Sequence, residues 1–215
     1  MAVTSTMELR AGIVRAFTGT DYPGDANLGA DAPHDPGYEG TIVARFFKGK
    51  DWREVTFERI LAEYDAPLQG MIAFMKPDGI RYYLPAFLVL SLDVAEDADT
   101  EEYAQLYTFV DSLCFYLARP SETLLRDQYN AVKDRPEVPE FIKEHLRNPT
   151  PQARQAVRAI VENHRRLVAS LSAAQRSIVA ETLAFLADCF RHQGVDETFN
   201  NAARALATTW GSFRA

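Results

Sequence analysis

The order of apolar and polar positions predicts a protein built from helices around one central helix at residues 76–92. From residue 80 to residue 92, only Arg81, Pro85 and Ser91 are neither apolar nor aromatic. The apolar positions therefore surround the helix instead of forming one stripe, which is typical of a helix buried on all sides. Pro85 removes a backbone hydrogen bond inside this helix, so we expect a kink or a break there.

Stripes of apolar residues at helical spacing predict further helices on both sides of the central one. Ser5 and Ser172 each begin a capping box, because Glu8 and Gln175 follow three residues later. Residues 41–47 have the β-branched content of a strand, but apolar pairs four residues apart favour a short helix. The predicted class is all-α, one domain of about seven to nine helices. The stripes cover residues 9–17, 41–47, 51–64, 68–75, 103–117, 121–132, 138–146, 157–171, 179–190 and 199–210.

Residues 18–40 form one long loop that is rich in glycine, proline and aspartate. Loops of this length inside compact domains are often functional. Aspartates such as Asp21 and Asp25 raise the question of calcium, but the EF-hand spacing fails. Ala30 and Pro36 occupy the positions that require glycine and glutamate. We therefore predict no metal and an irregular surface loop.

Composition narrows the class of protein further. The net charge is −7 and the pI is about 5.2, which disfavours nucleic-acid binding and suits a basic protein partner. Cys114 and Cys189 lie in apolar runs, so we expect buried free thiols and a reducing compartment. The apolar run at residues 80–92 is shorter than the ~20 residues that a bilayer requires, so we predict no membrane span. The N-terminus has no signal-peptide pattern, and the predicted location is the cytoplasm.

Motifs for catalysis or cofactor binding are absent from the sequence. It contains no phosphate-binding loop, dinucleotide fingerprint, zinc-protease motif or nucleophile elbow. Cys189 and His192 have the spacing of a thiol and its base, but a core thiol and a histidine at a helix end account for the pair more simply. His145 and His164 lie on apolar stripes and are interpreted as core residues. We predict no cofactor, no metal and, on balance, no enzymatic activity.

One group of residues remains as a candidate ligand site. Tyr82 and Tyr83, beside Pro85, are interpreted either as aromatic core or as the lining of a pocket under the loop. His34 is the histidine that we expect to be most exposed. The candidate ligand-binding residues are Asp21, Asp25, His34, Arg81, Tyr82 and Tyr83.

A row of arginines marks one face of the helix predicted at residues 157–171. Its members are Arg154, Arg158, Arg165 and Arg166. We interpret this row as a solvated helix face, with a contact patch for an acidic partner as the alternative.

Three segments carry a family resemblance. They read AF with YPGDANL at residues 16–28, FKGKDW at 47–52 and RYYLPAF at 81–87. Together they resemble a bacterial family of uncharacterised proteins, the domain of unknown function DUF6714. Segments near residues 171–176 and 205–210 also fit. The resemblance implies that the YPGD loop, Trp52 and the YYLPA helix form one unit, with Asp25 or Asn27 bonding free backbone groups at the Pro85 kink.

The family pattern has a shorter connection before the helix at Ser172, so residues 121–170 are interpreted as a helical insertion within a single domain of residues 1–215. The family carries no established activity to transfer. We expect a non-enzymatic interaction protein, in its concrete form a cytoplasmic antagonist of the immunity type that binds a toxin or effector through an acidic surface. The alternative is a small-ligand-binding protein or cryptic enzyme that uses the YPGD loop and the YYLPA kink. The sequence assigns no oligomeric state.

Overall fold

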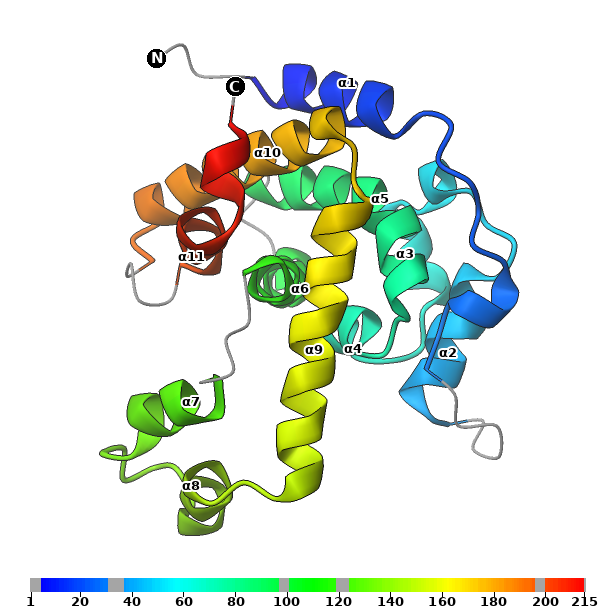
Figure 1. Ribbon diagram of the computed structural model, residues 1–215. Coiled ribbons are helices and arrows are strands. Elements are labelled where there is room, and N and C mark those ends of the chain that lie inside the picture. The colour runs from blue at the N-terminus through cyan, green and yellow to red at the C-terminus, as the bar shows by residue number, and fades with distance from the viewer. Residues whose placement is uncertain (1–4, 31–36, 97–100, 119–123, 196–199, 215) are drawn as a thin grey trace. The chain divides into compact units, whose positions relative to one another are not determined.

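The protein is all-α (Figure 1). The computed structural model describes residues 5–30, 37–96, 101–118, 124–195 and 200–214. Within them it has eleven α-helices, three short 3-10 helices and no strand, only an isolated bridge between Gly29 and Met75. The predicted fold class is confirmed.

The chain divides into two compact units. Unit 1 comprises residues 1–118 and 170–215, and unit 2 comprises residues 119–169. Unit 1 holds α1 (Thr6–Phe17), α2 (Glu39–Phe47), α3 (Phe57–Glu63), α4 (Leu68–Ala73), α5 (Pro77–Glu96), α6 (Glu101–Leu117), α10 (Ala173–His192) and α11 (Asn201–Thr208), with the 3-10 helices η1 (Asp25–Asn27), η2 (Trp52–Glu54) and η3 (Trp210–Phe213). Unit 2 holds α7 (Leu124–Val132), α8 (Glu140–Arg147) and α9 (Pro151–Ser170), whose last residue belongs to unit 1.

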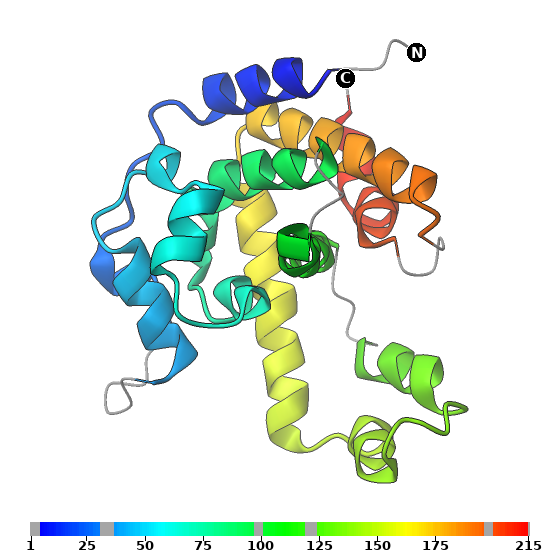
Figure 2. The ribbon, with the colours of Figure 1, turned by 180° about the vertical axis from the view of Figure 1, so that it is seen from behind.

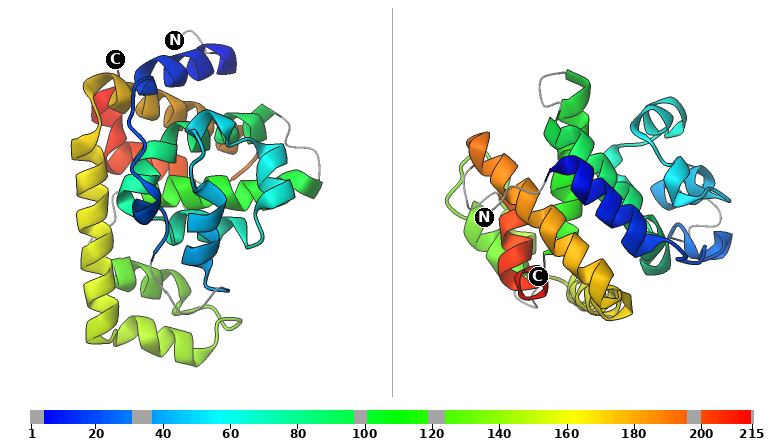
Figure 3. Two further views of the ribbon diagram at one scale, coloured as in Figure 1. Left: turned by 90° about the vertical axis from the view of Figure 1, so that its right-hand side faces the viewer. Right: turned by 90° about the horizontal axis from the view of Figure 1, so that it is seen from above.

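Helix α5 is the core of unit 1. It contacts α1, α6 and α10, and Figures 2 and 3 show α1, α10 and α5 lying side by side. Its side chains are buried around the whole circumference, as the sequence predicted. The helix is not broken at Pro85. It also continues to Glu96, beyond its predicted end at residue 92, because Val94 is buried and Asp93 pairs with Arg10 of α1 at 2.5 Å.

Helix caps account for most of the boundaries in unit 1. The capping boxes at Ser5 and Ser172 are both formed, which confirms these two helix starts. The stripe predicted as one helix at residues 51–64 is divided into two. Asp51 caps η2 and Thr56 caps α3 separately. Each cap satisfies backbone N–H groups at a new helix start, so this stripe contains a short 3-10 helix followed by an α-helix.

Unit 2 departs from the pattern of its sequence. The stripe at residues 138–146 was predicted to face a core, but Phe141 is 74% exposed and Ile142 is 38% exposed, while Lys143 is buried. His145 is also exposed, so its interpretation as a core residue is wrong. On α9 the prediction holds in part, because Val157, His164 and Leu167 are buried but Ile160 is 40% exposed. Helical spacing identifies residues that share a face, but it does not show that another element covers that face.

Two further expectations concern the burial of the cysteines and the hydropathy of the helices. Cys114 is buried, Cys189 is half-buried, and both are free thiols. Within the described ranges, no helix has the length and apolar character needed to cross a bilayer.

Candidate functional site

Tyr22 joins the loop after α1 to the turn after α2. Its hydroxyl donates to Asp25 Oδ1 at 2.6 Å and accepts from the backbone N–H of Gly49 at 2.9 Å. Gly49 has a φ of 67°, a conformation that glycine adopts without strain. The bond to the carboxylate lowers the pKa of Asp25 and, together with burial, raises the pKa of Tyr22. Asp25 also lies 3.6 Å from Lys48, so the carboxylate holds the loop in place.

Tyr83 joins the same turn to α5. Its hydroxyl donates to the carbonyl oxygens of Phe47 and Lys50, each at 2.8 Å, in a position with no solvent exposure. Burial raises its pKa well above the ordinary range, so the hydroxyl stays protonated. Tyr82 packs edge-on against both Tyr22 and Tyr83, with ring centroids 5.4 and 4.9 Å apart. The YPGD loop, the FKGKDW turn and the YYLPA helix therefore form one structural unit, as the resemblance implied.

The loop docks at the beginning of α5 and not at Pro85. The backbone N–H of Lys76 donates to the carbonyl of Leu28 at 2.7 Å, and its Nζ donates to the carbonyl of Ala26 at 2.9 Å. Asn27 donates to the carbonyl of Pro23. The expectation that Asp25 or Asn27 bonds backbone groups at the kink is therefore wrong, because both side chains are used inside the loop.

Five of the six candidate ligand residues are described by the structure, and they occupy three different environments. Tyr82 and Tyr83 are packed, at 5% and 0% exposure. Asp25 is held by Tyr22, whereas Asp21 and Arg81 are exposed at the surface. His34 lies outside the described residues. Of the six, the structure thus brings together Asp25, Tyr82 and Tyr83 through Tyr22, in an arrangement of packed rings and satisfied hydroxyls.

The cysteines and His192 lie in surroundings that do not favour catalysis or metal binding. Burial raises the pKa of both cysteine thiols, which opposes thiolate formation. His192 Nδ1 lies 2.6 Å from the carbonyl of Asp188, a residue of its own helix. Among the described residues, no group of three or more potential metal ligands occurs.

Charge is divided unequally between the two units. Unit 2 carries ten Lys and Arg against seven Asp and Glu, and unit 1 carries thirteen against twenty-three. The acidity of the whole protein therefore belongs to unit 1. This division is readable from the sequence only once the boundaries of the units are known.

Helix α3 presents an acidic face in unit 1. Glu58, Leu61 and Ala62 share one side of the helix and are exposed, and Asp65 follows two residues after its end. Leu61 is 45% exposed. The carboxylate of Glu58 accepts hydrogen bonds from the backbone N–H of Glu58 and from Thr56. These bonds lower the pKa of Glu58, so Glu58 is ionised at neutral pH. Neither Glu58 nor Asp65 has an ion-pair partner in the described part of the chain. We call these four residues the α3 face.

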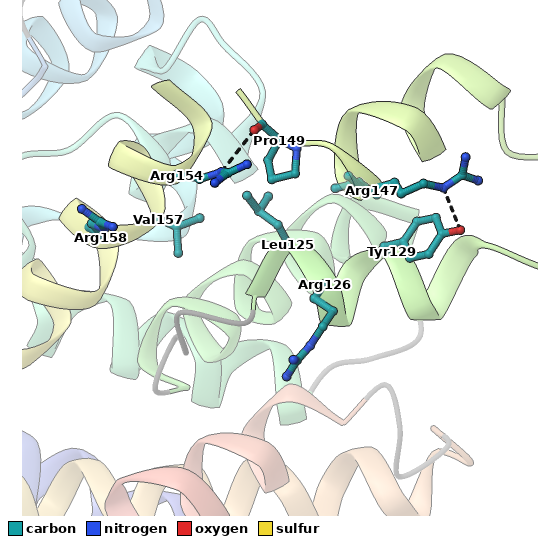
Figure 4. A pocket seen from close by; sticks show the side chains of 9 residues that line it. Leu125, Arg126, Tyr129, Arg147, Pro149, Arg154, Val157 and Arg158 are labelled. Carbon is teal, nitrogen blue, oxygen red and sulfur yellow. Dashed lines mark hydrogen bonds between the residues drawn. The ribbon is translucent and has the colours of Figure 1, made fainter. Parts of the chain in front are cut away.

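A pocket of about 360 Å³ lies within unit 2 (Figure 4). Its basic lining comes from Arg126 of α7 and from Arg154 and Arg158 of α9. Arg147 of α8 donates to the hydroxyl of Tyr129 at 3.0 Å, and its guanidinium lies 5.2 Å from the centre of that ring. The remaining lining residues are Leu125, Leu146, Pro149 and Val157.

The sequence profile of DUF6714, described as a family of unknown function, matches residues 5–135. The chain belongs to this family. The match includes all three segments of the YPGD, FKGKDW and RYYLPAF resemblance. No match was found among curated proteins or among solved structures.

Some of the features described above lie inside the DUF6714 match and others extend beyond it. It contains the tyrosine-linked unit and the α3 face, but it ends inside unit 2. The pocket combines residues before position 135, such as Arg126, with residues after it, such as Arg154 and Arg158. The segments near residues 171–176 and 205–210 lie outside the match.

Sequence reasoning singled out Arg154 and Arg158 but missed the pocket. Their spacing along α9 was visible, whereas the approach of Leu125 and Arg126 from α7 was not. The α3 face was also missed, because Leu61 was assigned to the buried side of a longer helix.

Proposed function

We propose that this DUF6714 protein acts by binding another protein, and that a basic partner docks on the acidic surface of unit 1 with the α3 face at its centre. The concrete form of this proposal is a cytoplasmic antagonist of a toxin or effector, as in immunity proteins. The observation that carries it is the α3 face, where two unpaired carboxylates flank an exposed leucine.

The chemistry of the α3 face suits a protein partner. An exposed apolar side chain with charged neighbours resembles an interface core with its polar rim. Carboxylates without ion-pair partners are available to lysine or arginine of a partner without first breaking an ion pair. The excess of acidic residues in unit 1 favours the encounter with such a partner at long range.

The alternative of ligand binding or catalysis at the YPGD loop has less support. The hydroxyls of Tyr22 and Tyr83 are both used in hydrogen bonds that hold the fold together. The rings of Tyr82 and Tyr83 pack against each other. These groups stabilise the junction of three segments, which is a sufficient reason for their presence.

The test begins with an affinity pull-down from the native host, with partners identified by mass spectrometry, followed by titration of the purified pair. Glu58→Lys with Asp65→Lys should weaken binding by about tenfold or more. The matched control is Asp78→Lys with Asp188→Lys. Asp78, like Glu58, lies in the first turn of a helix, and Asp188, like Asp65, is exposed.

The control changes the net charge by the same amount and should alter the affinity by no more than about twofold. Equal losses in both variants would show that overall charge matters but the α3 face does not. Unchanged binding in the Glu58 and Asp65 variant would refute the proposed docking surface. If the partner is toxic when expressed alone and harmless when co-expressed, the antagonist form of the proposal is supported.

A further inference from the structure

We propose that the pocket of unit 2 binds a small organic phosphate, with the phosphate held by Arg126, Arg154 and Arg158. This inference is independent of the proposed function, since it concerns the other unit and the opposite charge. The pocket volume of about 360 Å³ falls in the range of about 300–1,000 Å³ that small-molecule sites occupy.

The three arginines give the pocket positive charge that the described residues do not neutralise. In the described part of the chain, none of them pairs with a carboxylate, and Arg154 donates only to the carbonyl of Pro149 at 3.3 Å. Arg154 and Arg158 stand four residues apart on α9, a spacing at which like charges repel. A bound anion would remove this repulsion.

Other arginines of unit 2 are neutralised locally. Arg165 and Arg166 both pair with Glu162, at 3.0 and 3.1 Å. Arg147 pairs with Glu144 at 3.0 Å. Arg126, Arg154 and Arg158 therefore line the pocket without an acidic partner in the described residues, beside the paired Arg147, whereas Arg165 and Arg166 lie on α9 outside the pocket.

The number of cations favours phosphate over carboxylate. A carboxylate has two oxygens and is satisfied by one bidentate guanidinium. A phosphate monoester carries nearly two negative charges and three terminal oxygens, so it can bond more than one guanidinium at once. Arg126 comes from α7, and Arg154 and Arg158 come from α9. Figure 4 shows Arg126 and Arg158 projecting on different sides of Leu125, so these exposed side chains would turn toward a shared phosphate when it binds.

The rest of the lining suits an organic group attached to the phosphate. Leu125, Leu146 and Val157 provide apolar surface, and the ring of Tyr129 is fixed by its hydrogen bond and ring contact with Arg147. Burying apolar area of the ligand there adds affinity in proportion to the area. A ring-bearing phosphate should therefore bind more tightly than inorganic phosphate.

The test is calorimetric titration of the full chain at low ionic strength with phenyl phosphate, inorganic phosphate and benzoate. We expect phenyl phosphate to bind at one site per chain, about tenfold more tightly than inorganic phosphate. It should also bind about tenfold more tightly than benzoate, whose single charge engages fewer arginines. Raising the salt concentration should weaken all three.

A matched pair of variants locates the site. Arg154→Gln with Arg158→Gln should weaken phenyl phosphate binding by about tenfold or more. Arg165→Gln with Arg166→Gln removes the same charge from the same helix. It should change the affinity for phenyl phosphate by no more than about twofold. Arg126→Gln on α7 should also weaken it. All of these side chains are exposed, so the variants should fold, which circular dichroism checks.

Three outcomes would overturn the proposal. The first is no binding of phenyl phosphate at concentrations up to about 5 mM. The second is an equal loss in both double variants, which would mean a general effect of charge. The third is binding of a single-stranded RNA oligonucleotide at the same arginines without binding of phenyl phosphate, which would assign the pocket to nucleic acid.

Discussion

Tyr83 stabilises unit 1 through a single hydroxyl group. Without it, the carbonyl of Lys50 would lose this donor, and the carbonyl of Phe47 would keep only the backbone N–H of Lys50 at 3.2 Å. Leaving buried polar groups unsatisfied costs more than a typical hydrogen bond contributes. The residue that first suggested a ligand pocket is therefore interpreted as a structural one.

Replacement of Tyr83 by phenylalanine should lower the free energy of unfolding by about 1–3 kcal/mol. Tyr38→Phe is the control, because Tyr38 is only partly buried and contacts Phe74 through its ring. It should change the free energy of unfolding by less than about 0.5 kcal/mol. Urea denaturation measures both, and equal values for the two variants would contradict the role assigned to the Tyr83 hydroxyl.

Asp25 should make the stability of the loop dependent on pH. Its pKa in the folded protein lies below the ordinary value of 3.8, first because of the hydrogen bond from Tyr22. A lowered pKa gives stability that is present above the unfolded value and is lost as the pH falls through the folded value. Asp25→Asn should therefore lower Tm at pH 7, and this deficit should shrink below about pH 4.

Thermal unfolding at several pH values tests this dependence on Asp25, with Asp21→Asn as the exposed control. A deficit in Tm that is the same at pH 3 and pH 7 would show that the carboxylate charge is not the cause.

At the scale of elements, apolar spacing and capping residues predicted most of the helices. Ser5 and Ser172 start helices where the sequence placed them, and the buried circumference of α5 followed from its continuous apolar run. The predictions that failed concern the end of α5 and the burial of α8, which depend on the elements that pack against each helix. Residues 93–96 extend α5 because Val94 is buried and Asp93 pairs with Arg10 of α1. Phe141 stays exposed although it lies on an apolar stripe.

The candidate site was less predictable than the fold. The family segments correctly indicated that the YPGD loop, the turn and α5 belong together. Which atoms meet was not readable, because the bonds of Tyr22 and Tyr83 join segments more than twenty residues apart. The same limit hid the pocket, where α7 approaches α9.

Gly29 shows how closely the loop packs on α2. A Cβ atom at this position would lie 1.9 Å from the carbonyl oxygen of Gly40, a backbone atom that cannot rotate away. Gly29→Ala should therefore destabilise the protein by about 3 kcal/mol or more. In Gly12→Ala the new Cβ meets the end of the Ile178 side chain, which can move, and α1 gains helix propensity, so the change should stay within about 1 kcal/mol. Chemical denaturation compares the two, and equal costs would contradict the close packing at Gly29.

At the scale of the whole molecule, two units of opposite charge balance suggest two separate kinds of partner. We propose that the acidic unit 1 presents the α3 face to a basic protein and that the basic unit 2 binds a phosphate in its pocket. Within unit 1, the tyrosine-linked junction and α3 both lie in the part of the chain that matches DUF6714. The pocket includes residues beyond that match. The α3 face therefore lies wholly within the family region, whereas the pocket lies only partly within it.

The most direct test of the interaction account is amide hydrogen exchange of the protein alone and in complex with the partner found by pull-down. The account predicts slower exchange on binding at residues 57–65, with little change in the buried helix α5. Slower exchange confined to segments outside residues 57–65, with α3 unchanged, would contradict the proposal that the α3 face is the docking surface.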